Sequence, residues 1–240
     1  MAANLHEFDE TYRLEHAAHF TPERTGREVD ALVKALNLQP HESILDLACG
    51  WGRHLAELRR RGFAGLVGTD VQGAFLDPLE GVTLLEQDAA DLDFTAHFDA
   101  VYCAFNALFS SADAAPHVLS AVSRALKPGG RFLLDTTNRE RLAVAENPTR
   151  SWRGGEELPW LLEESHFDLW SGAQRITQRR IFAGGHLEAR TLTRLHYTLA
   201  ELVKLFGAAG LTVTDVYGDW RLGPYTALSP RTMVVSRKDV

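Results

Sequence analysis

Apolar runs alternate with amphipathic segments along the chain between residues 20 and 137. Five apolar runs predict strands buried on both faces, because they lack the polar alternation of a half-exposed sheet. These runs lie at residues 43–48, 64–70, 81–88, 98–105 and 131–137. Amphipathic segments at 27–38, 51–61 and 117–130 predict helices, the last one ended by Pro128 and two glycines. Alternating strands and helices predict an α/β fold with parallel pairing and helices on both faces of the sheet.

The pattern changes after residue 138. Residues 138–159 carry proline, a glycine pair and mixed charge, which indicates mostly loop. Three β-rich segments follow at 160–170, 174–183 and 186–197, and the glycine pair at 184–185 favours a hairpin turn between the last two. We therefore predict an antiparallel insertion of about three strands. Its aromatic residues, among them Trp152, Trp160 and Trp170, suit either a lid or the small core of this sheet, and we expect most of them to form the core.

A helix and two strands complete the chain. Thr198 is the expected N-cap of a helix that ends before Gly210. The segments 211–218 and 231–238 predict strands whose connection is too short for a crossover helix, so we expect antiparallel pairing. The predicted division is a Rossmann-like core of residues 1–137 and 198–240, with 1–20 as an N-terminal cap, and an insertion of residues 138–197.

Composition and charge narrow the class of protein. The 240 residues are 45% apolar and 24% charged, the profile of a soluble globular protein. A formal charge of -7 argues against non-specific nucleic-acid binding. Cys49 and Cys103 have no metal or disulfide spacing, and the polar N-terminus has no signal-peptide core. We expect a cytoplasmic protein with no membrane partner, either a monomer or a dimer.

The loop in "LDLACGWGRH", residues 45–54, is the first candidate for chemistry. It lacks the lysine of a phosphate-binding loop. Leu55 also stands where the dinucleotide fingerprint has its third glycine or alanine. Asp46 beside the loop would repel a diphosphate and attract an ammonium or sulfonium group. The loop therefore favours a cationic cofactor that carries an amino acid.

Acidic residues end the next two predicted strands. Asp70 follows Gly50 by twenty residues, a position where a carboxylate accepts both hydroxyls of a ribose. Asp88, with the backbone of Ala89, stands where it can bind the exocyclic amine of a purine. Each aspartate alone is as readily explained as a helix cap. Together with the glycine loop they predict a nucleoside-bearing cofactor at the carboxyl ends of the strands.

The segments "ILDLACGWGRH", "GTD", "EQDAADLDF", "FDAVYCAFNALFS" and "ALKPGGRFLLDT" resemble the ordered motifs of the class I S-adenosylmethionine-dependent methyltransferases. The resemblance is specific over residues 40–137. It implies a seven-stranded sheet with an antiparallel last strand and S-adenosylmethionine as cofactor. The implied contacts are Asp46, Ala48, Cys49, Gly50 and Gly52 around the methionine moiety, Asp70 at the ribose, Val71, Asp88 and Ala89 at the adenine, and Phe105 near the sulfonium. Tyr12 lies in the segment expected to close over the cofactor.

Two positions depart from the usual motifs of that family. Ala48 replaces the first glycine of the loop, a small change that we expect the backbone to tolerate. Residues 71–81 are short and contain Pro78, so we expect no full helix there and an abbreviated wall beside the adenine.

The acceptor side is less defined by the sequence. The insertion is expected to cover the acceptor, and it supplies His166 and His196 as candidate bases, although hydrogen-bonded strand histidines are the commoner case. Asn106, a candidate substrate-binding residue, is equally explained as a loop cap. Arg231 suits either an anionic acceptor or a structural ion pair. Asn106 is not followed by two prolines, which disfavours amino-methylation of bases or glutamine.

The sequence favours transfer of a methyl group from S-adenosylmethionine to a small-molecule acceptor by in-line displacement. Two alternatives stay open: a protein or RNA methyltransferase, and a non-catalytic S-adenosylmethionine-binding protein. Leu55 and Asp46 oppose a nicotinamide-dependent reductase. His16 and His19 have helical spacing but no evident third ligand, so we predict no metal site.

Overall fold

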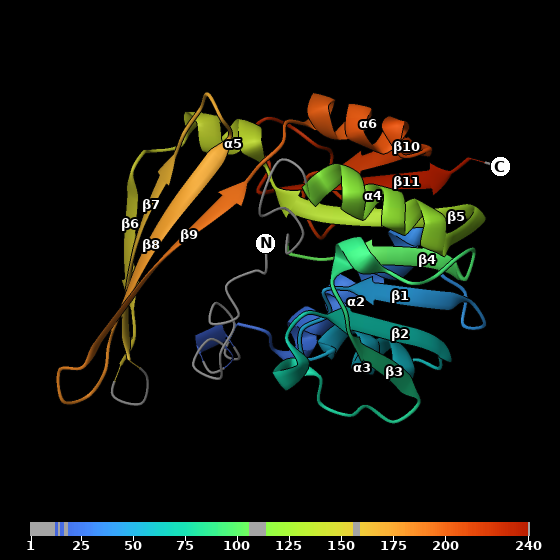
Figure 1. Ribbon diagram of the computed structural model, residues 1–240, viewed down its shortest axis with the longest axis horizontal. Helices are drawn as coiled ribbons and strands as arrows, with labels where there is room; N and C mark the ends of the chain where they lie inside the picture. Colours follow the sequence, from blue (N-terminus) through green and yellow to red (C-terminus); the bar gives the residue numbers. More distant parts are fainter. Residues whose placement is uncertain (1–12, 14, 17–18, 106–113, 156–158, 240) are drawn as a thin grey trace.

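Figure 1 shows the computed structural model, which describes residues 13, 15–16, 19–105, 114–155 and 159–239. Its helices are α2 (Pro22–Leu36), α3 (Arg53–Arg60), the 3₁₀ turns η1 (Gly73–Phe75) and η2 (Ala89–Asp91), α4 (Ala114–Ala125), α5 (Arg139–Val144) and α6 (Leu199–Ala208). Its first five strands are β1 (Ser43–Leu47), β2 (Gly65–Asp70), β3 (Val82–Glu86), β4 (Phe98–Cys103) and β5 (Leu126–Thr137). The others are β6 (Thr149–Arg153), β7 (Trp160–Phe167), β8 (Ala173–Ile181), β9 (Leu187–Leu195), β10 (Leu211–Tyr217) and β11 (Arg231–Lys238).

The main sheet has seven strands in the order β10-β11-β5-β4-β1-β2-β3. Strands β1 to β5 pair in parallel, whereas β11 runs antiparallel to both β5 and β10. This arrangement confirms the predicted Rossmann-like fold with an antiparallel last strand. The strand order reverses between β1 and β4, and in such sheets a ligand lies beyond the carboxyl ends at that point.

Both faces of this sheet are buried at the central strands β1, β4 and β5, as their unbroken apolar runs predict. The prediction was wrong for residues 81–88, because β3 is an edge strand whose residues are only half-buried or exposed. Leu45 and Leu47 of β1 pack on one side among residues of α4 and α6, whereas Ile44 packs on the other among residues of α2 and α3. Figure 1 shows α4 and α6 covering one face and α2 and α3 the opposite face. The helices thereby fix the carboxyl ends of β1, β2 and β4 at a single edge.

A second, antiparallel sheet has the order β6-β7-β8-β9. It has four strands, one more than the three that the sequence predicted. The additional strand is β6, which lies with helix α5 in residues 138–159, where the sequence predicted mostly loop. Strand β6 is the edge strand beside β7 and is almost fully exposed, so its sequence carries no apolar signal. Helix α5 has six residues, too few for a visible helical period.

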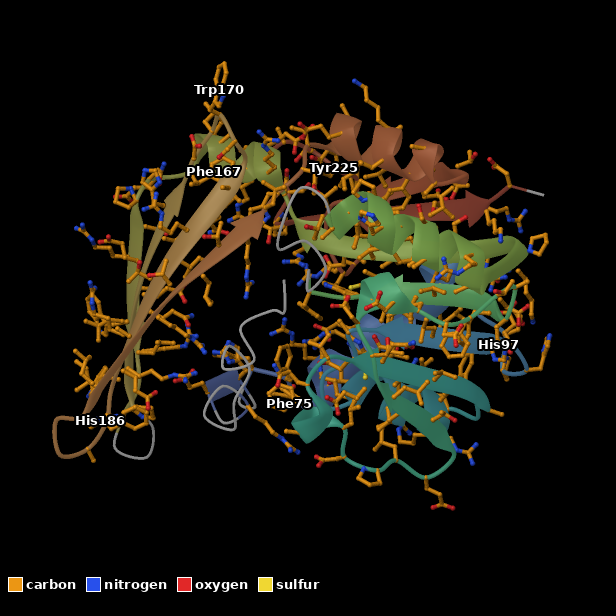
Figure 2. The ribbon with its side chains drawn as sticks, in the orientation of Figure 1. Phe75, His97, Phe167, Trp170, His186 and Tyr225 are labelled. Atoms are coloured by element: carbon orange, nitrogen blue, oxygen red, sulfur yellow. The ribbon has the colours of Figure 1, made fainter. Side chains whose placement is uncertain are left out.

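Gly184 and Gly185 have φ of 88° and 85° in the turn between β8 and β9, as the hairpin prediction requires. The tryptophans are not a core: Trp152 and Trp160 are exposed, and Trp170 projects from the end of the sheet at 95% exposure (Figure 2). Strand β5 begins at Leu126, before Pro128, because a register shift against β4 accommodates the intervening residues.

The carboxyl ends of the parallel strands face the four-stranded sheet, and the described part of the N-terminal segment lies between them (Figure 1). Glu15 of that segment forms an ion pair with Arg180 of β8, with N–O distances of 3.0 and 3.1 Å. Arg13 pairs with Asp77, in the loop after η1, at 2.7 Å. The segment therefore touches both the insertion and the main sheet. In the part of the chain that the structure describes, no helix is long and apolar enough to cross a membrane.

Candidate functional site

The glycine loop leaves β1 after Leu47 and enters α3 at Arg53. Three of its residues have a left-handed backbone: Ala48, Gly50 and Gly52 have φ of 60°, 55° and 71°. Alanine is strained in that region, whereas glycine is not. The substitution at Ala48 is therefore tolerated by the fold, but at a conformational cost that the sequence alone did not reveal.

Asp70, at the end of β2, is bound to this loop. Its Oδ2 accepts a hydrogen bond from the Gly50 N–H at 2.8 Å, and its Oδ1 accepts one from the Gln72 N–H at 2.9 Å. Burial raises the pKa of Asp70, and these backbone donors oppose the rise. The structure thus brings the glycine loop and the Asp70 carboxylate together, as the spacing of twenty residues between Gly50 and Asp70 predicts.

The space beside the loop is open at one glycine and filled at another. A Cβ placed on Gly50 meets no atom within 4 Å, whereas one on Gly52 would lie 2.8 Å from Leu79. A Cβ on Gly68 of β2 would lie 2.5 Å from Leu55. The Leu55 side chain therefore occupies the space that a side chain at Gly68 would fill. This lets α3 pack closely on the sheet although the loop has no third glycine.

Asp46 lies inside the sheet beneath this loop. It is 3% exposed, and its register partners are Gly68 on β2 and Tyr102 on β4. Burial raises the pKa of Asp46 to about 8, against the opposing effects of the Tyr102 hydroxyl and the Arg53 charge. A cation bound beside the loop would favour the ionised carboxylate.

The residues expected at the adenine lie at the ends of β2 and β3. Asp88 is exposed and caps η2, where its Oδ1 accepts a hydrogen bond from the Ala90 N–H at 2.9 Å. Ala89 begins η2, and Val71 is half-buried in the bend after β2. Residues 71–81 form only the 3₁₀ turn η1, so no full helix is present there. Phe75 of η1, labelled in Figure 2, packs against Trp51 of the glycine loop at 6.0 Å.

Phe105 follows β4 and also has a left-handed backbone, with φ of 64°. Its N–H donates to Asp135 Oδ2 at 2.9 Å. Its ring stacks on Trp220 with a centroid distance of 5.4 Å, and Phe20 contacts it edge-on at 5.8 Å. Phe105 is therefore part of an aromatic cluster built from the N-terminal segment, the loop after β4 and the β10–β11 connection.

Arg231 begins β11 and is held by a buried partner. Its Nε and Nη2 donate to the two oxygens of Asp135 at 2.7 and 2.8 Å, and Asp135 is fully buried. The guanidinium carbon lies 5.6 Å from the Phe105 ring centroid. Arg231 thus forms the structural ion pair, one of the two alternatives, and sits beside the residue expected near the sulfonium.

The two histidines of the insertion lie in different surroundings. His166 is on the exposed face of β7, opposite the face that carries Ser165. His196 follows β9, is 1% exposed, and shares a hydrogen bond of 2.8 Å between Nε2 and Gln174 Oε1. The Gln174 amide N–H donates to Ser165 Oγ, so Gln174 Oε1 faces His196 and accepts a hydrogen bond from His196 Nε2–H. His196 Nδ1 therefore carries the lone pair, and it is buried with no hydrogen-bond partner among the described residues.

Burial lowers the pKa of His196 to about 4, and the charges of Arg194, Arg231 and Arg139 act in the same direction. His196 is therefore a neutral imidazole near neutral pH. Two other predicted residues, Tyr12 and Asn106, lie outside the described residues. Among the described residues no three histidine, cysteine, aspartate or glutamate side chains gather as metal ligands would.

Sequence reasoning missed a charged group behind the loop. Glu28 of α2 accepts hydrogen bonds from Arg24 at 2.8 Å and from Arg53, and shares one of 3.1 Å with His54 Nε2. Burial opposes its ionisation, but His54 and Arg53 lower the pKa of Glu28 to about 2. Arg53 and His54, directly after Gly52, indicated a polar group near the loop. Nothing in the nearby sequence indicated that their partner is Glu28.

These residues fit the cofactor that the motifs imply. The open space at Gly50 admits a ligand against the backbone, Asp70 presents a carboxylate there, and Asp46 offers a counter-charge for an ammonium or sulfonium group.

Comparison with known proteins gives a consistent result. Residues 44–130 match the family model described as "Methyltransferase domain". The cypemycin N-terminal methyltransferase of a Streptomyces species is 32% identical over 209 residues, which cover 80% of this chain and 82% of that protein. The CcbJ methyltransferase of Streptomyces caelestis has a TM-score of 0.78 at 22% identity, covering 97% of this chain and 100% of that one. CalS10, an amino pentose methyltransferase of Micromonospora echinaspora solved with bound S-adenosylmethionine, has a TM-score of 0.72 at 22% identity, covering 99% and 100%.

Proposed function

Because this chain belongs to the class I S-adenosylmethionine-dependent methyltransferases, we propose that it methylates a small-molecule acceptor by in-line displacement. The bound cofactor supplies a methyl group already activated by a sulfonium. The residues of the chain then have to hold the donor, align the acceptor with it and exclude water. A strong base is needed only if the acceptor must lose a proton before it attacks.

The observation that carries the donor site is the hydrogen bond between the Gly50 N–H and the Asp70 carboxylate. It fixes the glycine loop and the ribose-binding carboxylate in one unit. In the proposal, Asp46 and the loop from Ala48 through Cys49 to Gly52 surround the methionine moiety, and Asp70 accepts the ribose hydroxyls. Val71, Asp88 and Ala89 bind the adenine, and Phe105 lies near the sulfonium.

We assign the insertion, residues 138–197, to the acceptor. It faces the carboxyl ends of the parallel strands, and its buried face carries polar groups such as Ser165, Gln174 and His196 (Figure 1). In the proposal the lone pair of the neutral His196 accepts a hydrogen bond from an acceptor amine, whereas His166 lies on the other face. Arg231 is committed to Asp135, so its role in the proposal is to support Phe105 rather than to bind the acceptor.

The acceptor atom in this proposal is nitrogen. CalS10 is named for an amino pentose and the cypemycin enzyme for an N-terminus, so both names point to amines. A small amine is our first candidate. The N-terminal amine of a peptide is the second, and the specific observation in its favour is the 32% identity to the cypemycin enzyme.

The test is a transfer assay with methyl-labelled S-adenosylmethionine against three acceptor sets: amino sugars and other small amines, peptides with a free N-terminus, and the same peptides acetylated. Asp70→Ala serves as the matched control, because it removes the ribose contact. We expect label in the small amines, lost in the control. Label confined to free-N-terminus peptides would replace the first candidate with the second. Donor binding with no transfer to any set, nor to a metabolite extract, would contradict the enzymatic proposal.

A further inference from the structure

The two terminal nitrogens of the Arg53 guanidinium differ in their hydrogen bonding to the described residues. Its Nη1 donates to Thr25 Oγ1 at 3.0 Å and to Glu28. Its Nη2 is buried and has no hydrogen-bond partner among the described residues. An unpaired buried N–H of a charged group is costly, and guanidinium groups satisfy it best with a carboxylate or phosphate oxygen. The unpaired N–H groups on Arg53 Nη2 therefore have the chemistry that binds an anion.

Aromatic rings hold this guanidinium in place. Its carbon lies 4.3 Å from the Phe20 ring centroid and 5.2 Å from that of Phe105. Contacts of this kind fix the plane of an arginine and cost it little hydration. The group is thus positioned before any ligand arrives, between the N-terminal segment and the residue that follows β4.

The local charge balance leaves one positive charge uncompensated. Glu28 is shared by the two guanidinium groups of Arg24 and Arg53. His54, its third partner, is neutral near pH 7, because burial lowers its pKa to about 4. Arg24 is further occupied, since its Nη1 donates to the His19 carbonyl at 3.0 Å. One carboxylate on the ligand would complete the balance at Arg53.

The position of Arg53 indicates which carboxylate that is. It directly follows Gly52, and the open side of Gly50 is three residues away. Its charge also acts on Asp46. We propose that Arg53 binds the α-carboxylate of the methyl donor through Nη2, opposite Asp46, which takes the ammonium group. This assignment rests on the proposed function and adds to it the means by which the amino-acid end of the donor is recognised.

If Arg53 binds the α-carboxylate, the protein should prefer a ligand that carries this group to the same ligand without it. S-adenosylhomocysteine carries that group, whereas its decarboxylated analogue, S-adenosyl-3-thiopropylamine, lacks it and is otherwise the same. The wild-type protein should bind S-adenosylhomocysteine more tightly by about ten- to a hundredfold, the range for a buried charge-assisted hydrogen bond. Without the Arg53 guanidinium the two ligands should bind about equally.

The experiment is calorimetric titration of both ligands into the wild type, Arg53→Gln, Arg53→Lys and Arg60→Gln. Arg60 lies on the same helix, is exposed and pairs with Glu57, so its variant is the matched control and should keep the wild-type preference. Arg53→Gln should lose affinity for S-adenosylhomocysteine and keep its affinity for the decarboxylated analogue. Arg53→Lys, which preserves a charge toward Glu28, should retain an intermediate preference. Binding of the analogue reports that each variant is folded.

The possible failures are distinct. A wild type that binds neither ligand would contradict the proposed function. A wild type that binds both ligands equally, or an Arg53→Gln variant that keeps the full preference, would contradict only the assignment of Arg53. If Arg53→Gln fails to fold, the wild-type preference and the Arg53→Lys variant still decide the question.

Discussion

Glu15 and Arg180 form a buried ion pair that joins the N-terminal segment to the four-stranded sheet, although 165 residues separate them. Their side chains are only 3% and 5% exposed. Phe20, five residues after Glu15, packs against Trp51 of the glycine loop at 5.7 Å. One short segment therefore contacts both the proposed donor site and the proposed acceptor cover.

Removing one partner of this pair should destabilise the protein strongly. Arg180→Met leaves the Glu15 carboxylate buried without its cation, and we expect a loss of about 3–5 kcal/mol in the free energy of unfolding. The double variant Glu15→Leu with Arg180→Met should recover most of that loss. Urea denaturation measures both. As a control, Arg150→Ala breaks the exposed pair with Glu164 and should cost under about 1 kcal/mol. Equal losses in the single and double variants would refute this account.

Ala48→Gly should stabilise the protein. The φ of 60° at Ala48 costs an L-residue roughly 1–2 kcal/mol, and glycine removes this strain. Part of the gain is offset, because glycine loses more conformational entropy on folding than alanine does. A net gain of about 0.5–1 kcal/mol should raise the melting temperature by about 1–4 °C. Ala56→Gly, at an exposed position inside α3, should instead lower stability by about 1 kcal/mol. A lower melting temperature for Ala48→Gly would show that this backbone is not strained.

Asp46 should make the stability of the ligand-free protein depend on pH. The pKa of Asp46 is about 8 in the folded protein, against an ordinary aspartate value of 3.8, so the native state holds an extra proton between these two pH values. Stability should therefore fall as pH rises from about 4 to about 8, by several kcal/mol at most, and then level off. Asp46→Asn should reduce this slope, be more stable than the wild type at pH 8, and bind the donor poorly. Denaturation between about pH 5 and 9 measures how the free energy of unfolding depends on pH. The same dependence in the wild type and in Asp46→Asn would contradict the raised pKa of Asp46.

Asp135→Asn should weaken both stability and donor binding. The Asp135 carboxylate holds the Arg231 guanidinium and the N–H of Phe105, whose φ of 64° is otherwise unfavourable. Loss of a buried pair of this kind costs about 3 kcal/mol. Asp99→Asn, which breaks the half-exposed pair with Lys127 at the other end of β4, should cost under about 1 kcal/mol and leave donor binding unchanged. If Asp135→Asn binds the donor as tightly as the wild type, the ion pair between Asp135 and Arg231 does not support the proposed donor site.

The sequence predicted the parallel core well because its determinants are local. Each buried strand is an apolar run, and the glycine loop and the Asp70 carboxylate follow consecutive strands, so parallel pairing had to bring them together. The exposed edge strand β6 gave no such signal, because its residues point into solvent on both faces.

The rest of the site depends on contacts between residues far apart in the chain. Glu28 and Arg53 are 25 positions apart, and Asp135 and Arg231 are 96 apart. No spacing rule relates such pairs, because the packing of α2 on α3 and of β11 on β5 decides which charges meet. The strain at Ala48 was also invisible, since a residue's identity does not report its φ.

In the proposed donor site the glycine loop and Asp70 bind the methyl donor together, and calorimetric titration with S-adenosylhomocysteine measures this binding. We expect the wild type to bind S-adenosylhomocysteine, and Asp70→Ala to bind it at least about tenfold more weakly, because this variant loses the proposed acceptor for the ribose hydroxyls. Asp88→Ala, at an exposed position, should lose less. Unchanged affinity in Asp70→Ala, or binding of NADH with no response to S-adenosylhomocysteine, would contradict the account.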